Sequence, residues 1–512
     1  MSRVVVVGAG VGGLAAAIRL AATGHSVTVC EQAAEVGGKL GYYERDGFQF
    51  DTGPSLLTMP LVFADLFAET GAPIDAALDL TPVEPIAHYR FADGTELDAS
   101  ADLDVFCAEL DGALGAGSGA DWRAFMTRAG HIWDATRGPF LDSALTGPLG
   151  LARQAVRLAD LRAIAPGRTL RSLGQQYLGD PRLRMFLDRY ATYTGSDPRR
   201  APAALAVVPY VEQTFGAWYV AGGLRRIADA LAERAVRLGA TLRLGTDVSE
   251  VSTGPRGVTG VRLASGEVLA ADVVVANADA RHLYEDLVPD RRADRARRRL
   301  ARSTPSLSGF VLLLGVRGTT PGLAHHTVLF PAAYDDEFDA VFTLPQPVPD
   351  PTIYLSVPKD AAIAPAGCEA WFVLVNAPRQ GPVDWDSPGL ADRYADSLLA
   401  LMAARGVDVR DRVVFREIRT PADLERRTRA VGGAIYGTSS NGARAAFLRP
   451  ANASPVPGLY LVGGSSHPGG GLPLVVLSAK IVAGLVGPAA ASRPGRPVRR
   501  APGVQRGRAD RS

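Results

Sequence analysis

The chain has 512 residues, of which 47% are hydrophobic and 21% charged, with a formal net charge of +2 at pH 7. A single hydrophobic core stops growing at about 250–300 residues, so we expect at least two domains. The small net charge gives no overall attraction to nucleic acid. The three cysteines lie far apart, without the spacing of metal ligands, and fit a reduced, cytosolic compartment.

Residues 3–31 predict a strand, a glycine-rich turn, a helix and a second strand, in that order. Four valines at 4–7 are typical of a strand buried on both faces, and a helix is expected from Leu14 to Ala22. The turn between them has the G-x-G-x-x-G spacing, which brings backbone amides and the positive end of the helix dipole to a pyrophosphate. Its glycines, all expected to lie at the cofactor, are Gly8, Gly10, Gly12 and Gly13.

The second strand ends at Glu31, whose carboxylate is placed to accept hydrogen bonds from ribose hydroxyls. We therefore predict a dinucleotide site, and an ordinary glycine-rich turn is the alternative. The motif alone does not distinguish NAD from FAD. A second glycine pair, Gly37 and Gly38, follows with Lys39 beside it, and an aromatic strand over 42–50 leads to a Gly53–Pro54 turn. This second pair suits a long, extended dinucleotide.

On these motifs the chain resembles the bacterial phytoene desaturase family, within the broader superfamily of FAD-dependent, amine oxidase-like proteins. The resemblance implies an α/β fold, with a Rossmann-like FAD-binding domain of the amine oxidase/glutathione reductase type and an interleaved α+β substrate domain. It also implies that Glu31, Gly38, Lys39, Gly53 and Pro54 line FAD. Many relatives have Arg at the position of Lys39, where a point charge here replaces a planar fork.

The middle of the chain returns to the nucleotide-binding pattern. Apolar residues spaced three and four apart predict a one-sided helix over 224–235, and the next strand is expected to end at Asp247–Val248 and to join the cofactor sheet. In relatives the residue matching Val248 contacts adenine through its backbone. A hairpin and a buried strand then lead to Asn277 and Asp279, and the resemblance implies that this ending lies near the cofactor. A strand-terminating turn explains these two side chains nearly as well.

Two insertions separate the cofactor-binding segments. We predict a discontinuous FAD-binding domain made of residues 1–75, 215–290 and 412–488. Residues 76–214 and 291–411 are predicted to form the substrate domain, which faces the membrane, and residues 489–512 a disordered basic tail.

Two basic segments bear on membrane binding. Residues 147–173 carry five arginines beside an apolar face, as in a helix lying among lipid headgroups; a surface helix packed on its own domain is the alternative. The tail after residue 492 has seven Arg against one Asp and is either solvated or bound to anionic lipid. The chain has no uncharged apolar run of about 18 residues, and its first residues lead straight into a strand. We therefore expect a cytoplasmic protein associated peripherally with the membrane.

The C-terminal region predicts the last strand of the cofactor sheet, a glycine-rich turn and a helix beginning near Gly471. Gly463 and Gly464 would let backbone approach the ribityl chain of FAD. Amides at the helix start, from Leu472 to Leu474, would point at the pyrimidine carbonyl of the flavin.

Histidines are weighed separately. His467 is a candidate proton carrier beside the flavin, although a His–Pro pair more often shapes a turn. Ser465 and Ser466 directly precede it, and adjacent residues cannot adopt the geometry of a catalytic triad. His325 and His326 are expected to diverge on a strand, so no metal site is predicted.

The resemblance implies an FAD-dependent carotenoid desaturase that introduces double bonds into a C40-type polyene by hydride transfer to flavin. Residues 50–71 and 179–203 are similar to the subgroup acting at the 3,4-position of 1-hydroxylated carotenoids, and phytoene is the other candidate substrate. The expected partners are the hydrophobic polyene, a membrane surface, and dioxygen or a quinone as electron acceptor. The alternatives are another flavin-dependent carotenoid oxidase or isomerase, an amine oxidase, which would need an aromatic pair beside the flavin, and a noncatalytic lipid or prenyl carrier.

Overall fold

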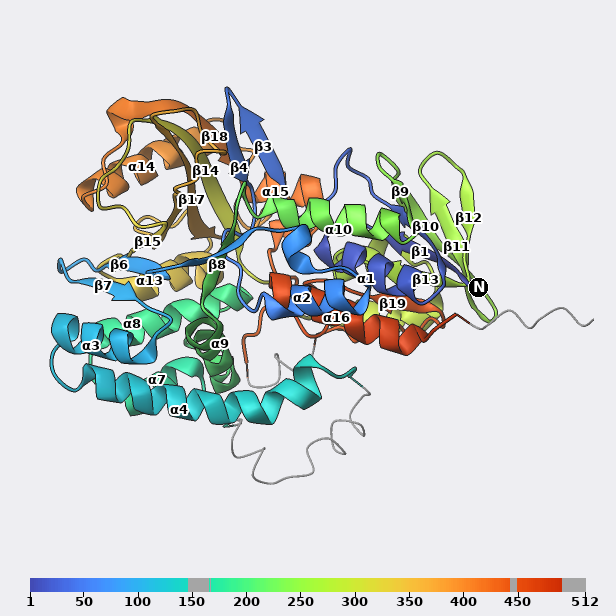
Figure 1. The fold of residues 1–512 in the computed structure, drawn as a ribbon, viewed down its shortest axis with the longest axis horizontal. Coiled ribbons are helices and arrows are strands. Elements are labelled where there is room, and N and C mark those ends of the chain that lie inside the picture. Colours follow the sequence, from blue (N-terminus) through green and yellow to red (C-terminus); the bar gives the residue numbers. More distant parts are fainter. Residues whose placement is uncertain (146–164, 166, 443–448, 490–512) are drawn as a thin grey trace, which may run out of the picture.

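A computed structural model describes residues 1–145, 165, 167–442 and 449–489 of the chain (Figure 1). Most of the amphipathic segment predicted over 147–173, and all of the basic tail except Ala489, lie outside these residues.

The first sheet is parallel and has the strand order β19–β13–β1–β2–β9. Its strands are β1 (Arg3–Val7), β2 (Ser26–Cys30), β9 (Thr241–Arg243), β13 (Val273–Ala276) and β19 (Leu459–Leu461). The valines of β1 are buried on both faces, because β1 is the central strand and both faces of the sheet are covered. The sequence therefore predicts the centre of this sheet correctly.

Helices cover one face of this sheet and a second, smaller sheet covers the other. In Figure 1, α1 (Val11–Ala22) lies between α10 (Arg225–Arg237) and α16 (Leu472–Val486), and it packs against both. The smaller sheet is the antiparallel β10–β11–β12, formed by Val248–Gly254, Gly257–Leu263 and Val268–Ala270. The strand expected after α10 does join the parallel sheet as β9, but its predicted end at Asp247–Val248 was wrong. β9 already ends at Arg243, and Val248 begins β10.

The second large sheet has seven strands in the order β18–β14–β17–β16–β15–β6–β7. These are β6 (Ala87–Arg90), β7 (Glu96–Ala99), β14 (Ser308–Arg317), β15 (His326–Leu329), β16 (Ile353–Ser356), β17 (Cys368–Ala377) and β18 (Val413–Arg419). All neighbouring strands are antiparallel except β15 and β6. A layer of helices lies beside the β6–β7 end of this sheet at the lower left of Figure 1: α3 (Leu103–Leu114), α4 (Ser118–Thr136), α7 (Leu170–Tyr177), α8 (Pro181–Arg189) and α9 (Val207–Phe215).

Shorter elements connect these layers. Two strand pairs, β3 (Tyr42–Arg45) with β4 (Phe48–Asp51) and β5 (Leu80–Val83) with β8 (Ala217–Val220), stand outside both large sheets. Among the described residues, the remaining α-helices are α2 (Leu61–Glu69), α11 (Ala280–His282), α12 (Asp294–Ala301), α13 (Tyr334–Phe338), α14 (Leu390–Ala404) and α15 (Pro421–Thr428). The aromatic stretch predicted as one strand is a hairpin, because Asp46 and Gly47 turn the chain with positive φ angles of 52° and 80°.

The pairings also bear on the predicted domain boundaries. Residues 413–419 form β18, which pairs with β14 in the seven-stranded sheet, although the sequence assigned them to the FAD-binding domain. Residues 217–220, assigned to the same domain, pair with β5, which the sequence assigned to the substrate domain. The interleaving of a parallel and an antiparallel unit follows the prediction, while the division of the chain into domains stays a prediction.

Candidate cofactor and substrate site

A cavity of about 530 Å³ lies beyond the carboxyl ends of the parallel strands and extends to the seven-stranded sheet. Ligands of open α/β sheets bind at this edge. Of the residues predicted to bind the cofactor, the lining includes Gly8, Gly10, Gly12, Glu31, Gly38, Lys39, Gly53, Pro54, Val248, Asp279, Gly463, Gly464 and Leu472. The structure therefore brings thirteen of the predicted cofactor-binding residues to one cavity, and only Gly13 and Leu474 are absent from its lining.

Asn277 packs between the two glycine-rich turns, which lie at opposite ends of the sequence. A Cβ atom on Gly10 would come within 2.5 Å of Asn277 Nδ2, and one on Gly463 within 2.6 Å of Asn277 Oδ1. At Gly12 the same carboxamide oxygen would be 2.8 Å away. Side chains at these three positions would collide with Asn277, so the turns need bare backbone to close around one carboxamide and leave the cavity open.

Gly13 serves packing rather than the cavity wall. A Cβ atom there would lie 2.2 Å from the carbonyl oxygen of Gly8, which itself has a φ of 96°. The first turn of α1 therefore rests directly on the end of β1, as the third glycine of the motif predicts. The helix begins at Val11 rather than at Leu14, and its amino terminus points its free amides toward the turn.

Glu31 is buried at the end of β2 and lines the cavity. Its Oε2 accepts a hydrogen bond from the backbone N–H of Ala9 at 2.6 Å, and its Oε1 accepts one from Ala33 N–H at 3.0 Å. Each carboxylate oxygen has a second lone pair, which fits the predicted hydrogen bonds from ribose hydroxyls.

The Gly38–Lys39 loop is fixed by a close backbone contact and a buried ammonium. A Cβ atom on Gly53 would lie 1.8 Å from the carbonyl oxygen of Lys39, so only glycine fits there. Lys39 Nζ donates hydrogen bonds to the carbonyl oxygens of Ala434 at 3.0 Å and Ile435 at 2.5 Å. Burial lowers the pKa of Lys39, and the negative charge of Asp279 partly opposes this shift. Lys39 therefore ties the cofactor loop to the segment after α15.

Asp279 lines the cavity and has one buried oxygen without a hydrogen-bond partner among the described residues. Its Oδ1 accepts a hydrogen bond from Arg281 N–H at 2.9 Å and so caps α11. Its Oδ2 is buried without a hydrogen-bond partner among the described residues. An orphaned acceptor beside a glycine cradle fits the hydroxyl-rich linker of a dinucleotide, so the residues present fit FAD.

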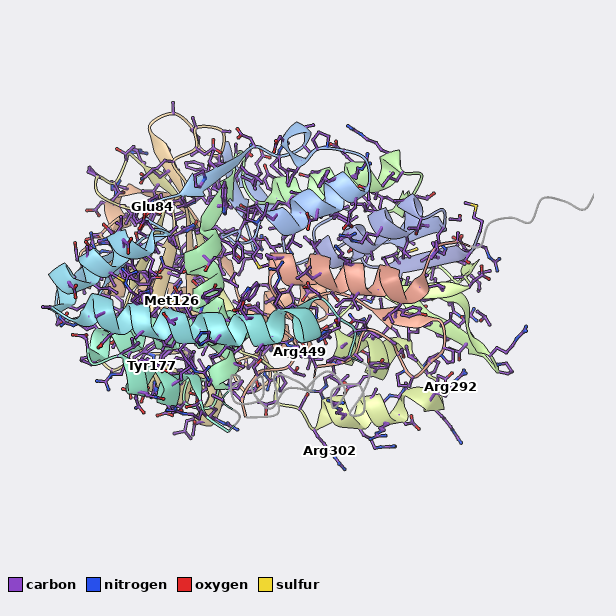
Figure 2. All side chains as sticks on the ribbon, turned by 60° about the horizontal axis from the view of Figure 1, so that its bottom comes forward. Glu84, Met126, Tyr177, Arg292, Arg302 and Arg449 are labelled. Atoms are coloured by element: carbon purple, nitrogen blue, oxygen red, sulfur yellow. The ribbon has the colours of Figure 1, made fainter. Side chains whose placement is uncertain are left out.

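The C-terminal turn is anchored by Arg449, which Figure 2 labels. Its Nη1 donates to the carbonyl oxygens of Tyr436 and Gly464, both at 2.9 Å, and burial lowers its pKa to about 10. The ring of Tyr436 lies so close to Gly470 that a Cβ there would meet it at 2.5 Å. In α16, Pro473 occupies one of the first two positions and has no N–H, which leaves Leu472 and Leu474 as the donors predicted to face the flavin.

His467 is buried, and it is absent from the cavity lining. Its Nε2 lies 3.0 Å from the carbonyl oxygen of Ser143, and burial lowers the pKa of the ring to about 4. Its role as a proton carrier stays a prediction.

The expectation that His325 and His326 diverge was wrong. Their ring centroids are 4.3 Å apart, because β15 begins only at His326 and the alternation of a strand does not apply to His325. Across the described ranges of the chain, no cluster of three or more His, Cys, Asp or Glu side chains has the arrangement of a metal site.

Sequence reasoning missed a group of polar side chains in the cavity wall. Arg189, Tyr193, Tyr334, Tyr354 and Tyr436 all line it. The first two belong to the stretch 179–203, in which Arg189 ends α8 and two tyrosines, Tyr190 and Tyr193, follow it. That mixture was the available signal. It gave no indication that these side chains face inward.

Comparison with known proteins identifies the class. Residues 11–337 match the model of the flavin containing amine oxidoreductase family. The 4,4'-diapolycopene oxygenase of Methylomonas sp is 37% identical over 489 residues, which cover 94% of this chain and 97% of that protein. The 1-hydroxycarotenoid 3,4-desaturase of Flavobacterium sp. (strain P99-3) is 32% identical over 495 residues, covering 95% and 99%.

Solved structures agree on the fold. The cyclohexylamine oxidase from Brevibacterium oxydans IH-35A superposes with a TM-score of 0.60 at 16% sequence identity, over 94% of this chain and 98% of that one. The site and fold thus define a flavin-dependent oxidoreductase. The chain belongs to the flavin containing amine oxidoreductase family, and its predicted fold class and FAD cofactor are confirmed. None of the described helices is both long and apolar enough to cross a bilayer.

Proposed function

We propose that the chain is an FAD-dependent carotenoid desaturase that introduces double bonds into a C40-type polyene, with phytoene and a 1-hydroxylated carotenoid as candidate substrates. The carrying observation is the shape of the cavity. The glycine cradle continues into a chamber walled by β14, β16 and β17, where Val311, Phe372 and Leu374 present apolar side chains. Relatives named for carotenoid desaturation and oxygenation support the substrate class.

FAD, when bound, supplies the acceptor for a hydride from a saturated carbon pair. Bound FAD would be held and oriented by the chain: Glu31 would hold the ribose, Asp279 would accept a hydroxyl, and the two glycine turns would admit the phosphates and the linker. A hydrocarbon offers nothing to hydrogen-bond, so the apolar wall holds the polyene by shape and excludes water. Alignment and desolvation are therefore the main contributions of the protein.

The test is anaerobic mixing of FAD-loaded protein with phytoene, lycopene and a 1-hydroxycarotenoid in turn. A desaturase substrate bleaches the flavin and yields a pigment that absorbs at longer wavelength. If none of the three polyenes bleaches the flavin while a simple amine does, the proposal fails in favour of an amine oxidase. A colourless protein that refuses FAD and binds prenyl lipids would instead be a carrier.

A second candidate is the oxidation of a terminal methyl group of the same substrate class. It is favoured by the 37% identity to a 4,4'-diapolycopene oxygenase. The product distinguishes the two reactions, because only the second adds oxygen to the polyene.

We also propose that the protein binds a membrane surface, from which a carotenoid must be drawn. The stretch from Arg291 to Arg302, which includes α12, carries seven arginines, and Figure 2 shows Arg302 at the outer edge of the molecule. Exposed arginines attract anionic headgroups by about 1 kcal/mol each. Replacing Arg295, Arg298 and Arg302 by Gln should reduce sedimentation with phosphatidylserine vesicles, while binding to phosphatidylcholine vesicles stays unchanged.

Dioxygen and a quinone are both candidate acceptors of electrons from the reduced flavin. The rates at which each reoxidises the flavin distinguish them.

A further inference from the structure

The cavity wall contains a buried cation. Arg189 is the last residue of α8, only 7% of its surface is exposed, and it lines the cavity. Among the described residues no carboxylate forms an ion pair with it. A wall that held only a hydrocarbon would have no use for an unpaired guanidinium, which costs free energy to bury.

Tyrosines surround the guanidinium in place of a carboxylate. Arg189 Nη1 donates to Tyr193 Oη at 2.6 Å and to Tyr89 Oη at 3.3 Å. The guanidinium carbon lies 5.0 Å from the ring centroid of Tyr193, 5.6 Å from that of Tyr89 and 5.7 Å from that of Tyr354. Such rings stabilise a desolvated cation, but this offsets only part of the cost of burying it.

Glu212, the acidic group that interacts electrostatically with Arg189, is hydrogen-bonded to a tyrosine. Glu212 is fully buried, and its Oε1 accepts a hydrogen bond from Tyr190 Oη at 2.7 Å. Burial raises the pKa of Glu212 and the positive charge of Arg189 partly opposes this shift, so the two groups attract each other without forming an ion pair. Tyr354 Oη is also engaged, with Ser55 Oγ at 2.7 Å and His326 Nδ1 at 2.8 Å, so Tyr354 presents its ring face to Arg189.

Three of the five N–H donors of Arg189 therefore remain without an acceptor among the described residues. Within the described residues, Nε and Nη2 have no hydrogen-bond acceptor, and neither atom is sealed from the cavity. A planar fork of free donors in an apolar chamber matches an oxygen acceptor on a bound molecule.

We infer that Arg189, held in place by Tyr193, binds an oxygen atom carried by the polyene substrate and selects oxygen-bearing polyenes over hydrocarbons. The inference rests on the proposed function and favours its hydroxylated-carotenoid branch over phytoene. The oxygen belongs to a hydroxyl, carbonyl or carboxylate group. A site built around a substrate oxygen discriminates strongly against the analogue that lacks it, because the donors are then left unpaired in the bound state.

The test measures binding rather than turnover. FAD-loaded full-length protein is titrated with four C20 polyene probes of matched length, which end in a methyl, alcohol, aldehyde or carboxylate group, and the shift in polyene absorbance gives each Kd. We expect at least one oxygen-bearing probe to bind tenfold or more tightly than the hydrocarbon. The probe that binds best identifies the oxygen group.

Variants assign the discrimination to Arg189. R189M should bring the Kd of the hydrocarbon probe and that of the best oxygen-bearing probe to within twofold of each other, while hydrocarbon binding stays within about twofold of the wild type. R189K should keep an intermediate ratio of these two Kd values. The matched control is R405M: Arg405 is a largely buried arginine with a carboxylate partner, Asp350, and lies outside the cavity. It should lower stability and leave the ratio intact. Should R189M fail to fold, R189Q keeps amide donors for the tyrosine hydroxyls and replaces it.

Equal Kd values for all four probes in the wild type would overturn the inference, as would a ratio that survives R189M or R189Q. The outcome is separable from that of the proposed function. Selective binding without flavin bleaching by any carotenoid would sink the desaturase proposal and leave this inference standing. Bleaching by hydrocarbon and hydroxylated carotenoids alike, with no difference in Kd, would do the reverse.

Discussion

Replacing Gly13 by alanine tests how closely α1 must approach β1 to bind the cofactor. The added Cβ would lie 2.2 Å from the carbonyl oxygen of Gly8, whereas a relaxed contact between carbon and oxygen needs about 3.3 Å. The helix start must therefore retreat by about 1 Å, and forced repacking of this kind costs about 1–3 kcal/mol. Because the same helix start carries the free amides for the pyrophosphate, the loss should appear in FAD affinity as a 10- to 100-fold rise in Kd.

The assay is titration of apoprotein with FAD, followed by quenching of flavin fluorescence, together with thermal unfolding. Gly484 is the matched control: it lies in α16, and a Cβ there would meet nothing within 4 Å. Since alanine is favoured over glycine in a helix by about 0.8–1.0 kcal/mol, G484A should bind FAD normally and unfold at the same or a higher temperature. If G13A matches G484A in both measurements, the close helix-to-strand contact has been misjudged.

Three further predictions concern individual side chains. K39M should lower FAD occupancy, because it leaves the carbonyls of Ala434 and Ile435 unpaired at a cost of about 1–3 kcal/mol. The control K480M removes only an exposed ion pair with Glu69 and should cost less than about 1 kcal/mol. Equal effects of the two variants would contradict this role for Lys39. D279N should weaken FAD binding several-fold without lowering apoprotein stability, and unchanged FAD affinity would show that Oδ2 accepts no hydrogen bond from the cofactor. His467 has a folded-state pKa of about 4, below its ordinary value of 6.5, so it stabilises the fold fully above pH 6.5 and loses that contribution as pH falls toward 4. The free energy of unfolding, measured by chemical denaturation, should therefore fall by about 2 kcal/mol less between pH 7 and pH 5 in H467Q than in the wild type. A bell-shaped loss of turnover without this stability change would favour its role as a proton carrier.

The sequence predicts most reliably where local geometry decides the structure. The order of valine strand, glycine turn, helix and terminal Glu31 is found as expected, because it depends on contacts between residues close in sequence. Gly13, for example, packs against the carbonyl oxygen of Gly8. The C-terminal strand, turn and helix are predicted for the same reason. Errors fall at short strands, where Val248 begins β10 instead of ending β9, and at the 42–51 hairpin, whose Asp46–Gly47 turn is a hairpin signal that the sequence reasoning overlooked.

Contacts between distant segments were beyond the reach of the sequence. Asn277 appeared as either a turn residue or a cofactor neighbour, and only the structure shows that it fills the space between the turns at Gly10 and Gly463. Arg189 meets Tyr354 through the packing of α8 against the seven-stranded sheet, which no periodicity in either segment encodes. The candidate site was therefore predicted on its cofactor side and missed on its substrate side.

The proposed function requires a single FAD, held between two distant glycine turns, to accept electrons from a polyene in the adjoining chamber. Anaerobic titration of the FAD-loaded protein with a 1-hydroxycarotenoid tests this directly. We predict that one equivalent of polyene bleaches one equivalent of flavin and that the pigment gains a double bond. Flavin absorbance that persists under excess polyene, with the polyene recovered unchanged, would contradict the account.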